Sequence, residues 1–151
     1  MKKAVCAPLL MFFIVSLLFC GVCAAGPAED AKAFVQKAVE YIKANGKEKA
    51  YQEFTNGTQF KKGELYIFVL DSKYNMLAHG GNAKMVGKNF KELKDANGKA
   101  FLKEMVDKGI NQGSGWTDYV WTNPVTKKIE RKSSYVVKVD DTVVGCGIYK
   151  K

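Results

Sequence analysis

The C-terminal stretch, residues 113–149, constrains the fold more than any other part of the chain. It reads GSGWTDYVWTNPVTKKIERKSSYVVKVDDTVVGCGIY. Aromatic and β-branched residues dominate segments 116–122, 128–139 and 142–149, which predicts three strands. The connections Asn123-Pro124 and Asp140-Asp141 are short turn sequences, and short turns join antiparallel neighbours. We therefore predict an antiparallel meander of three strands.

Helical and strand patterns precede this meander. Apolar residues recur at helical spacing over 29–44, and Asn45-Gly46 ends that pattern, which predicts an amphipathic helix followed by a short second helix over 47–54. The continuous apolar run 65–70 (LYIFVL) predicts a central strand covered on both faces, and 76–79 a short returning strand. We expect a further helix that starts at 95–98, buries Phe101, Leu102, Met105 and Val106, and ends at Gly109. The sequence thus predicts an α+β domain with a five-stranded antiparallel sheet and helices packed on it.

The first 25 residues have the layout of an export signal. Lys2 and Lys3 precede an uncharged segment, 4–25, with the apolar centre LLMFFIVSLLF and small residues at its end. This pattern predicts a secretory signal peptide, cleaved near Ala24 or Ala25, and a single domain over 26–151 in the periplasm or outside the cell. An uncleaved membrane anchor is the alternative, since the uncharged segment is long enough to span a bilayer.

Charge and cysteine content exclude several classes of function. The formal charge is +9, but the lysines are scattered and Arg131 is the only arginine, which favours a solvated surface over a nucleic-acid interface. Cys146 is the one cysteine after the leader, so we expect it to be a buried core residue and expect no disulfide or zinc site. No phosphate-binding glycine loop or nucleophile motif is present, and we expect neither a cofactor nor an enzyme.

Aromatic and cationic residues of the meander are candidate ligand contacts. Tyr119 and Trp121 share one face of their strand and, with Tyr135 on the next strand, could wall a small cavity. An aromatic core is the alternative. Alternation places Arg131 with Tyr135 and Lys132 on the opposite face, so we expect that a bulge would be needed to bring Lys132 inward. The competing interpretation is that either cation points into solvent.

Two further features lie near this predicted cavity. His79 ends the short strand before two glycines, where it could reach over a pocket mouth and contact a carboxylate, or simply be a surface histidine. Gly145 and Gly147 flank Cys146 in the last strand. Glycine there indicates close approach by a ligand or another backbone, or else a bulge or crowded packing.

The order of several short motifs resembles the single Cache domain family over about 31–149. The motifs are Gly87-Lys88-Asn89, then Lys94-Asp95-Ala96-Asn97-Gly98-Lys99 with Phe101, Gly113-Ser114-Gly115-Trp116, Asp118-Tyr119, Trp121, Asn123-Pro124, Lys132 with Ser134-Tyr135, and Gly147-Ile148-Tyr149.

This resemblance implies a PAS-like sheet behind a long N-terminal helix and an extracytoplasmic sensor pocket for small molecules. Ligands of such domains are often short carboxylates such as acetate, propionate or pyruvate. On this chain the resemblance points to a pocket lined by Tyr119, Trp121, Lys132, Tyr135 and His79. We expect Tyr66 and Phe68 of the central strand to complete its wall.

Cache domains usually lie between two membrane helices of a chemoreceptor or histidine kinase, whereas this sequence ends two residues after Tyr149. We therefore expect a stand-alone sensor that passes its signal to a separate membrane-bound receptor or kinase. The alternative is a ligand-free interaction module that docks on a membrane receptor or transporter. A sheet face without a cavity and an exposed apolar patch would favour that alternative.

Overall fold

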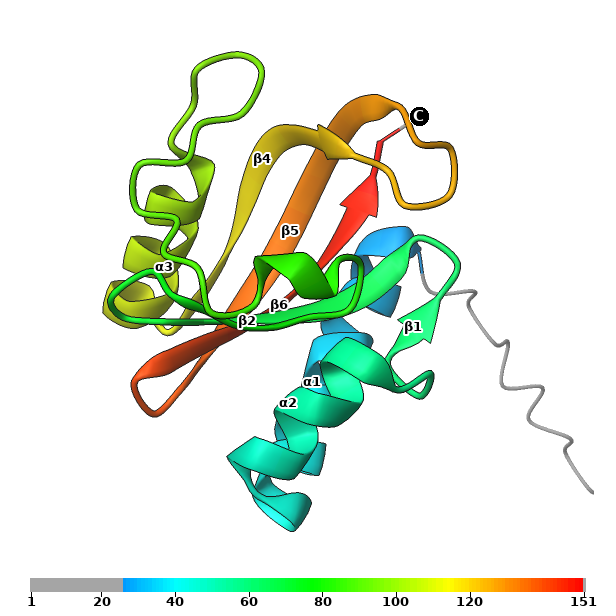
Figure 1. The fold of residues 1–151 in the computed structure, drawn as a ribbon, viewed down its shortest axis with the longest axis vertical. Helices are drawn as coiled ribbons and strands as arrows, with labels where there is room; N and C mark the ends of the chain where they lie inside the picture. The colour runs from blue at the N-terminus through cyan, green and yellow to red at the C-terminus, as the bar shows by residue number, and fades with distance from the viewer. Residues whose placement is uncertain (1–25, 151) are drawn as a thin grey trace, which may run out of the picture.

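The computed structural model describes residues 26–150, so the predicted leader, residues 1–25, lies outside the described residues. Ten elements follow one another along the chain (Figure 1). They are α1 (Pro27–Asn45), α2 (Lys47–Asn56), β1 (Lys61–Lys62), β2 (Leu65–Asp71), β3 (Met76–His79), the 3-10 helix η1 (Ala83–Met85), α3 (Phe101–Gln112), β4 (Ser114–Thr122), β5 (Ile129–Val139) and β6 (Thr142–Tyr149).

The strands form one antiparallel sheet in the order β1-β2-β6-β5-β4, with β3 paired to β2. The five predicted strands are present, and the two-residue β1 adds a short sixth. The last strand, β6, lies between β2 and β5 at the centre of the sheet, where the ladders on both sides satisfy its backbone groups. The predicted α+β fold and C-terminal meander are confirmed.

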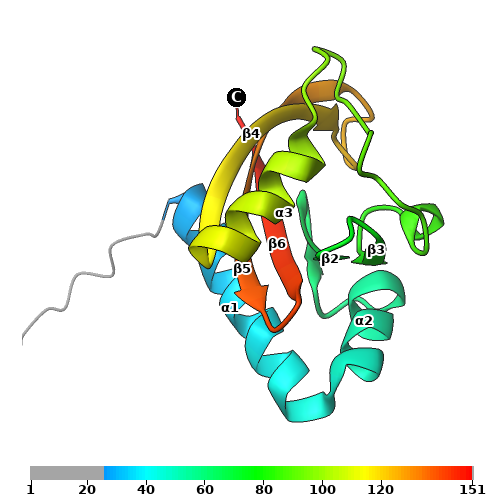
Figure 2. The same ribbon diagram turned by 90° about the vertical axis from the view of Figure 1, so that its left-hand side faces the viewer.

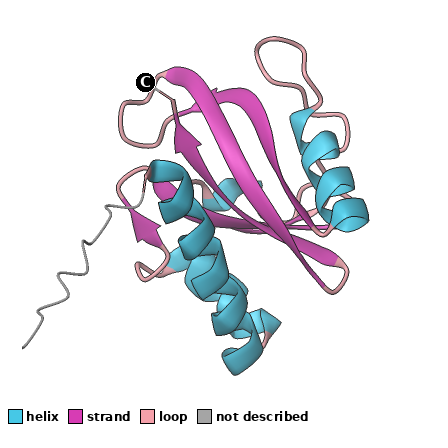
Figure 3. Cartoon of the chain, turned by 180° about the vertical axis from the view of Figure 1, so that it is seen from behind, coloured by secondary structure: helices cyan, strands magenta, loops and turns pink. Residues whose placement is uncertain are grey.

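Different helices cover the two faces of the sheet (Figures 2 and 3). On one face, here called the outer face, α1 packs against Ile67, Val69, Val144 and Cys146. On the other, the inner face, α3 packs against a cluster that includes Phe68, Leu70, Val136 and Val143. Successive residues of β2 thus face different helices, which explains why that strand is apolar throughout. Cys146 is fully buried as predicted, and burial raises the pKa of its thiol to about 12.

The register of β5 decides which of its side chains face inward. Its pairing with β4 runs without interruption from Ser114↔Val137 to Thr122↔Ile129. In this regular ladder Lys132, Ser134 and Val136 lie on the inner face, and Arg131 and Tyr135 on the opposite one. The predicted need for a bulge was wrong, because Lys132 points inward from a regular strand.

The helix α3 differs from its prediction at both ends. It starts at Phe101, because the carboxylate of Asp95 instead closes a turn by accepting hydrogen bonds from the backbone N–H groups of Asn97 and Lys99, both at 2.9 Å. Gly109 lies inside the helix, where a Cβ atom would be 2.4 Å from Cγ1 of Val143. The glycine is therefore a point of close helix–sheet contact, and the helix ends before Gly113, whose φ is +82°.

Candidate ligand-binding site

A polar patch crosses the inner face of the sheet. Tyr119 of β4 is paired with Lys132 of β5, and Lys132 in turn with Tyr149 of β6. Next to this row, Thr117 is paired with Ser134. All five side chains are buried, whereas Phe68, Leu70, Val136 and Val143 on the same face are apolar. Polar groups are costly to bury without partners, so their hydrogen bonds define the chemistry of the site.

Lys132 is the most unusual member of the patch. Its side chain is 1% exposed, and its Nζ atom donates a hydrogen bond to the hydroxyl oxygen of Tyr66 at 2.6 Å. The same atom lies 4.0 Å from the centre of the Tyr66 ring and 4.7 Å from that of Tyr149. Within residues 26–150, no carboxylate forms an ion pair with it. Burial therefore lowers the pKa of the amine to about 7.

Two glycines of β6 make room for this arrangement. A Cβ atom on Gly147 would lie 2.3 Å from both Cε of Lys132 and Oγ of Ser134. One on Gly145 would lie 2.4 Å from Cζ of Phe68. Of the explanations left open for these glycines, the structure shows crowded side-chain packing. Gly147 in particular lets the lysine chain pass over β6 toward β2.

The tyrosine hydroxyls of the patch are neutral hydrogen-bonding groups. Burial raises the pKa of Tyr66 and of Tyr119 well above the usual range. The hydroxyl groups of Tyr119 and Ser134 share a hydrogen bond of 2.9 Å, and Tyr149 donates to the backbone carbonyl of Thr122 at 2.9 Å. Since the oxygen of Tyr66 accepts from Lys132, its own hydrogen can be donated to a further acceptor, and the hydroxyl oxygen of Tyr149 is one within reach.

A small cavity, here called the inner cavity, lies beside the patch, and Tyr119 belongs to both. Its volume is about 10 Å³, enough for no more than one water molecule. Aromatic rings, apolar side chains and one histidine enclose it. They are Tyr66, Phe68, Met76, His79, Met85, Phe101, Leu102, Tyr119 and Trp121.

A larger pocket, here called the mouth pocket, shares four of these walls. Its volume is about 260 Å³, and Tyr66, His79, Met85 and Trp121 separate it from the inner cavity. Residues of the segment after β3 and of the β4–β5 turn complete it. They are Gly81, Asn82, Thr122, Asn123, Pro124 and Lys127. This volume is just below the range of about 300–1,000 Å³ that is usual for ligand sites, which suits a molecule of few heavy atoms.

Side-chain donors characterise the mouth pocket, and none of its lining residues carries a carboxylate. Nδ1 of His79 accepts from the backbone N–H of Asn82 at 2.9 Å, which places the proton of the neutral ring on Nε2. Burial and the neighbouring Lys132 lower the pKa of His79 to about 3, so the ring is neutral near pH 7. In the described part of the chain, neither Nε2 of His79 nor the indole N–H of Trp121 has a hydrogen-bond partner.

Nearby acidic groups are already engaged. Asn123 donates from its Nδ2 atom to Glu64 and Glu130, each at 2.7 Å. These two carboxylates are therefore held beneath the β4–β5 turn. Among the donors of the mouth pocket, Nε2 of His79 and the indole N–H of Trp121 can therefore serve an acceptor from outside the protein.

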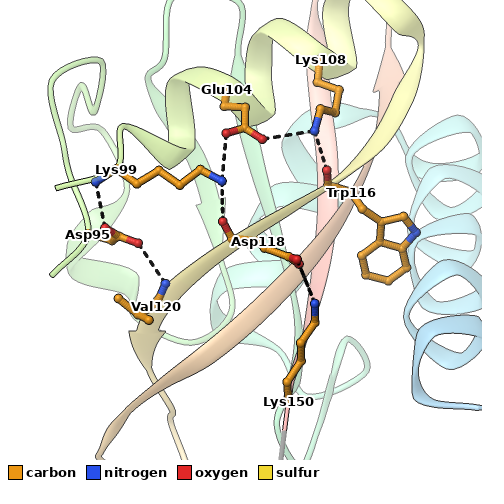
Figure 4. Close-up of polar contacts among 8 residues, drawn as sticks. All are labelled: Asp95, Lys99, Glu104, Lys108, Trp116, Asp118, Val120 and Lys150. Carbon is orange, nitrogen blue, oxygen red and sulfur yellow. Dashed lines mark hydrogen bonds and ion pairs between the residues drawn. The ribbon is translucent and has the colours of Figure 1, made fainter. Parts of the chain in front are cut away.

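An ionic network fixes the cover of the inner cavity (Figure 4). Lys99 donates to the backbone carbonyl of Asp118 at 2.6 Å and pairs with Glu104 at 2.9 Å. Lys108 pairs with Glu104 at 3.2 Å and donates to the carbonyl of Trp116 at 2.6 Å. Asp95 accepts from the backbone N–H of Val120 at 3.0 Å. The start of α3, which carries Phe101 and Leu102, is thereby tied to β4.

The structure places the predicted site residues in three groups. Tyr66, Phe68, His79, Tyr119 and Trp121 line the inner cavity, and three of them also line the mouth pocket. Lys132 lines neither of these two spaces, but it donates a hydrogen bond to Tyr66, which lines both.

Two predicted residues lie on the other face of the sheet. Tyr135 packs against Trp116, with ring centres 5.3 Å apart, and Arg131 is exposed. The prediction that Tyr135 shares a cavity wall with Tyr119 and Trp121 was wrong, because the cavity lies on the inner face and Tyr135 points outward. Arg131 lines neither the inner cavity nor the mouth pocket, but it lies with Tyr119 and Lys132 at a separate space of about 300 Å³.

Several residues of the site were not predicted. Asn82, Met85 and Lys127 come from the η1 segment and the β4–β5 turn, which have no periodic pattern. Ser134 and Tyr149 belong to the motifs that resemble the Cache family. Each lies two residues from Lys132 or Gly147 in its strand, a spacing that could have placed both side chains on the inner face. Within residues 26–150 no cluster of acidic, histidine or cysteine side chains could hold a metal ion. Over the same range, no helix has the length and apolar character of a membrane span.

Comparison with known proteins identifies the family. Residues 28–151 match the family described as "Single Cache domain 2", and the chain belongs to this family of sensor domains. Cache domains of this kind are the extracytoplasmic sensor parts of chemoreceptors and histidine kinases.

Individual relatives agree with this assignment. The chain is 34% identical over 86 residues to the sensor histidine kinase MctS of Rhizobium johnstonii, a match that covers 56% of this chain and 18% of the kinase. It is similar in fold to a methyl-accepting chemotaxis protein of Vibrio parahaemolyticus, with a TM-score of 0.71, 25% identity, and coverage of 81% and 87% of the two chains. A structure titled "Structural basis for carboxylic acid recognition by a Cache chemosensory domain" has a TM-score of 0.70 at 24% identity, covering 82% and 93%.

Proposed function

We propose that this chain is an exported sensor domain that binds a short carboxylate, such as acetate, propionate or pyruvate, in the mouth pocket. The observation that carries the proposal is a pocket with side-chain donors and no carboxylate among its lining residues, next to a buried amine that has no counter-ion within residues 26–150. Carboxylate oxygens accept several hydrogen bonds at once and match such a set of donors. Cache membership makes a sensory role the natural context for such a site.

The ligand would use the pocket in two ways. Its carboxylate would accept from the hydroxyl of Tyr66, from Nε2 of His79 and from the indole of Trp121. Its short tail would lie against the apolar side chain of Met85. Because the inner cavity is only about 10 Å³, a longer tail would meet closed packing. We therefore expect acids of two to four carbons to bind better than longer ones.

Lys132 would act on the ligand through Tyr66. Its N–H group donates to the phenol oxygen at 2.6 Å, which polarises the hydroxyl and strengthens the bond that the hydroxyl donates onward. A protonated amine so close would also attract the carboxylate in a medium of low dielectric constant. This arrangement gives the lysine a binding role although it does not line the pocket.

Thermal-shift measurements test the proposal. Acetate, propionate and pyruvate should raise the melting temperature of the purified domain, whereas acetamide and propionamide should not, because they lack the anionic oxygens. Calorimetry would then give the dissociation constant for the best acid. Tyr66→Phe should weaken binding about tenfold or more, since a charge-assisted hydrogen bond contributes about 1.5–3 kcal/mol. Tyr135→Phe, on the outer face, is the matched control and should bind normally; equal shifts by acids and amides would contradict the proposal.

We infer further that the ligand-bound domain acts through a separate membrane-bound receptor or kinase. The support is the kinship with the sensor histidine kinase MctS, of which the matched region is a minor part. Cross-linking in the source cells, with and without the best acid, tests this: a ligand-dependent adduct with one receptor or kinase is expected. The same adducts with Tyr66→Phe as with the unmodified domain would contradict a ligand-dependent contact. The pocket favours this function over a ligand-free docking module, for which a sheet face without a cavity was expected.

A further inference from the structure

The side chains nearest to the buried amine of Lys132 are neutral. The rings of Tyr66 on β2 and Tyr149 on β6 face the amine, and Tyr119 is the neighbour of Lys132 on β4. His79 on β3 lies close enough for Lys132 to lower its pKa. Above them, α3 contributes Phe101, which stacks on Tyr119 with ring centres 4.3 Å apart. None of these groups can neutralise an ammonium ion.

Two acidic groups are near enough to influence the amine weakly. The thiol of Cys146 and the carboxylate of Glu64 both favour its charged form, but burial outweighs them. Burial itself keeps the thiol protonated, and Glu64 is held by Asn123. Within residues 26–150 the amine thus has one hydrogen-bond acceptor, a phenol oxygen at 2.6 Å, and forms no ion pair.

We propose that the domain takes up its carboxylate ligand together with one proton, and that Lys132 holds this proton. The inference rests on the proposed function, because it requires a carboxylate next to Tyr66. A ligand anion there would supply the negative charge that the protein does not provide, and the charged amine would then become the favoured form. Atoms and charges balance simply: one anion and one proton enter, and no covalent bond changes.

The expected pH dependence of carboxylate binding follows from the pKa of about 7 that the Lys132 amine has in the ligand-free domain. Well below pH 7 the amine is already protonated, and the anion binds without proton uptake. Above pH 7 the amine of the ligand-free domain is deprotonated and must regain a proton on binding. The affinity for the carboxylate therefore falls about tenfold for each further pH unit, up to the pKa that the Lys132 amine has in the complex. Short carboxylic acids have pKa values of about 4, so the ligand stays ionised throughout this pH range. The titration of His79, at a pKa of about 3, also lies outside it.

This linkage changes what the sensor reports. A site that binds anion plus proton responds to the product of the two concentrations above neutral pH. The domain would therefore respond more strongly to an acidifying source of the ligand than to the same anion in alkaline surroundings. That behaviour suits detection of an excreted acid.

Calorimetry of the intact domain with acetate and with propionate tests the inference. Titrations near pH 6 and near pH 8.5, each in two buffers of different ionisation enthalpy, measure the protons taken up per ligand. We expect almost none near pH 6, close to one near pH 8.5, and a dissociation constant that is about tenfold or more higher at the upper pH. Binding with no proton uptake at both pH values overturns the inference and leaves the carboxylate function intact. No binding by any of the acids at either pH overturns both.

Matched variants assign the proton to Lys132. Arg131→Met removes the neighbouring cation from the opposite face and should keep the uptake near pH 8.5. Lys132→Met should bind more weakly near pH 6 and lose the uptake. Uptake that persists in Lys132→Met assigns the proton elsewhere and overturns the inference. If that variant does not fold, the nitrogen-15 chemical shift of Lys132 Nζ, followed with pH in the free and the ligand-saturated domain, decides: an unchanged pKa overturns the inference.

Discussion

Nζ of Lys132 and the hydroxyl oxygen of Tyr66 lie 2.6 Å apart, although the two residues come from strands separated by β6. The lysine chain passes over Gly147 to make this contact. The bond joins β5 to β2 across the centre of the sheet and lies beside the mouth pocket. The same two residues therefore affect the stability of the domain and the chemistry of the proposed site.

Tyr66→Phe should destabilise the ligand-free domain. The substitution leaves the buried amine of Lys132 without its hydrogen-bond acceptor, which costs about 1–3 kcal/mol in free energy of unfolding. Urea unfolding at pH 6.5 measures the loss, at a pH where most of the amine is protonated. Tyr135→Phe should change the stability by less than about 0.5 kcal/mol, since no partner of its hydroxyl is found within residues 26–150. Equal losses in the two variants would disprove the importance of the bond.

Gly147→Ala tests the space over β6. The added methyl group would lie 2.3 Å from Cε of Lys132 and from Oγ of Ser134, so both side chains must move. We expect a loss of about 1–3 kcal/mol in denaturant unfolding and a weaker response to acetate, because the lysine is displaced from Tyr66. Gly26→Ala is the control, since no heavy atom outside its chain neighbours lies within 4 Å of the added carbon. A Gly147→Ala domain as stable as the control would refute the crowding argument.

Lys132→Met should change how the stability of the ligand-free domain depends on pH. In the folded protein the amine has a pKa of about 7, below its usual value of 10.5, so between these values the unfolded chain binds more protons. The free energy of unfolding therefore rises with pH in this window, by up to about 1 kcal/mol per pH unit from this group. Unfolding from pH 7.5 to 9.5 should show a shallower rise in the variant. Near pH 6.5 the variant should be at least as stable as the unmodified domain, because an apolar chain replaces a buried charge.

The strands could be predicted from the sequence because each is a run of aromatic and β-branched residues bounded by turn residues, which is a local pattern. Segment 142–149 coincides with β6, and 76–79 with β3. The helix α3 was predicted too early because Asp95-Ala96-Asn97-Gly98 resembles a helix start. The carboxylate of Asp95 closes a turn instead and also reaches Val120 of β4, a contact between distant segments that no local pattern reveals.

The site was predicted in part for a similar reason. Alternation correctly separates Arg131 and Tyr135 from Lys132, but it does not say which face carries the cavity. That choice depends on α1 covering one face and α3 the other, a tertiary arrangement. Cavity walls from irregular segments, such as Asn82 and Met85, have no periodicity at all. Turn chemistry identifies such segments as connections but does not place them over a particular face.

His79→Asn should make the domain less sensitive to acid. The folded-state pKa of His79 is about 3, against an ordinary value of 6.5, so the unfolded chain binds more protons between these values. The stability associated with the neutral ring is present above pH 6.5 and is lost as the pH falls toward 3. Between pH 6.5 and 4.5 the unmodified domain should lose about 1–2 kcal/mol more than the variant, whose amide oxygen can still accept from Asn82. Parallel stability profiles in urea would contradict the burial of a neutral histidine.

Asp95→Ala should loosen the cover of the inner cavity. The carboxylate accepts backbone hydrogen bonds from Lys99 and Val120 (Figure 4) and from Asn97, and the alanine variant leaves all three donors without it. We expect a loss of about 1–2 kcal/mol in stability and faster amide exchange at Val120, which the carboxylate ties to the loop before α3. Glu92→Ala removes an exposed carboxylate from the same loop and serves as the control. Because Phe101 and Leu102 follow this turn directly, Asp95→Ala should also let a longer acid, such as hexanoate, bind better relative to acetate. Unchanged exchange at Val120 together with an unchanged preference between the two acids would show that the turn does not control the cover.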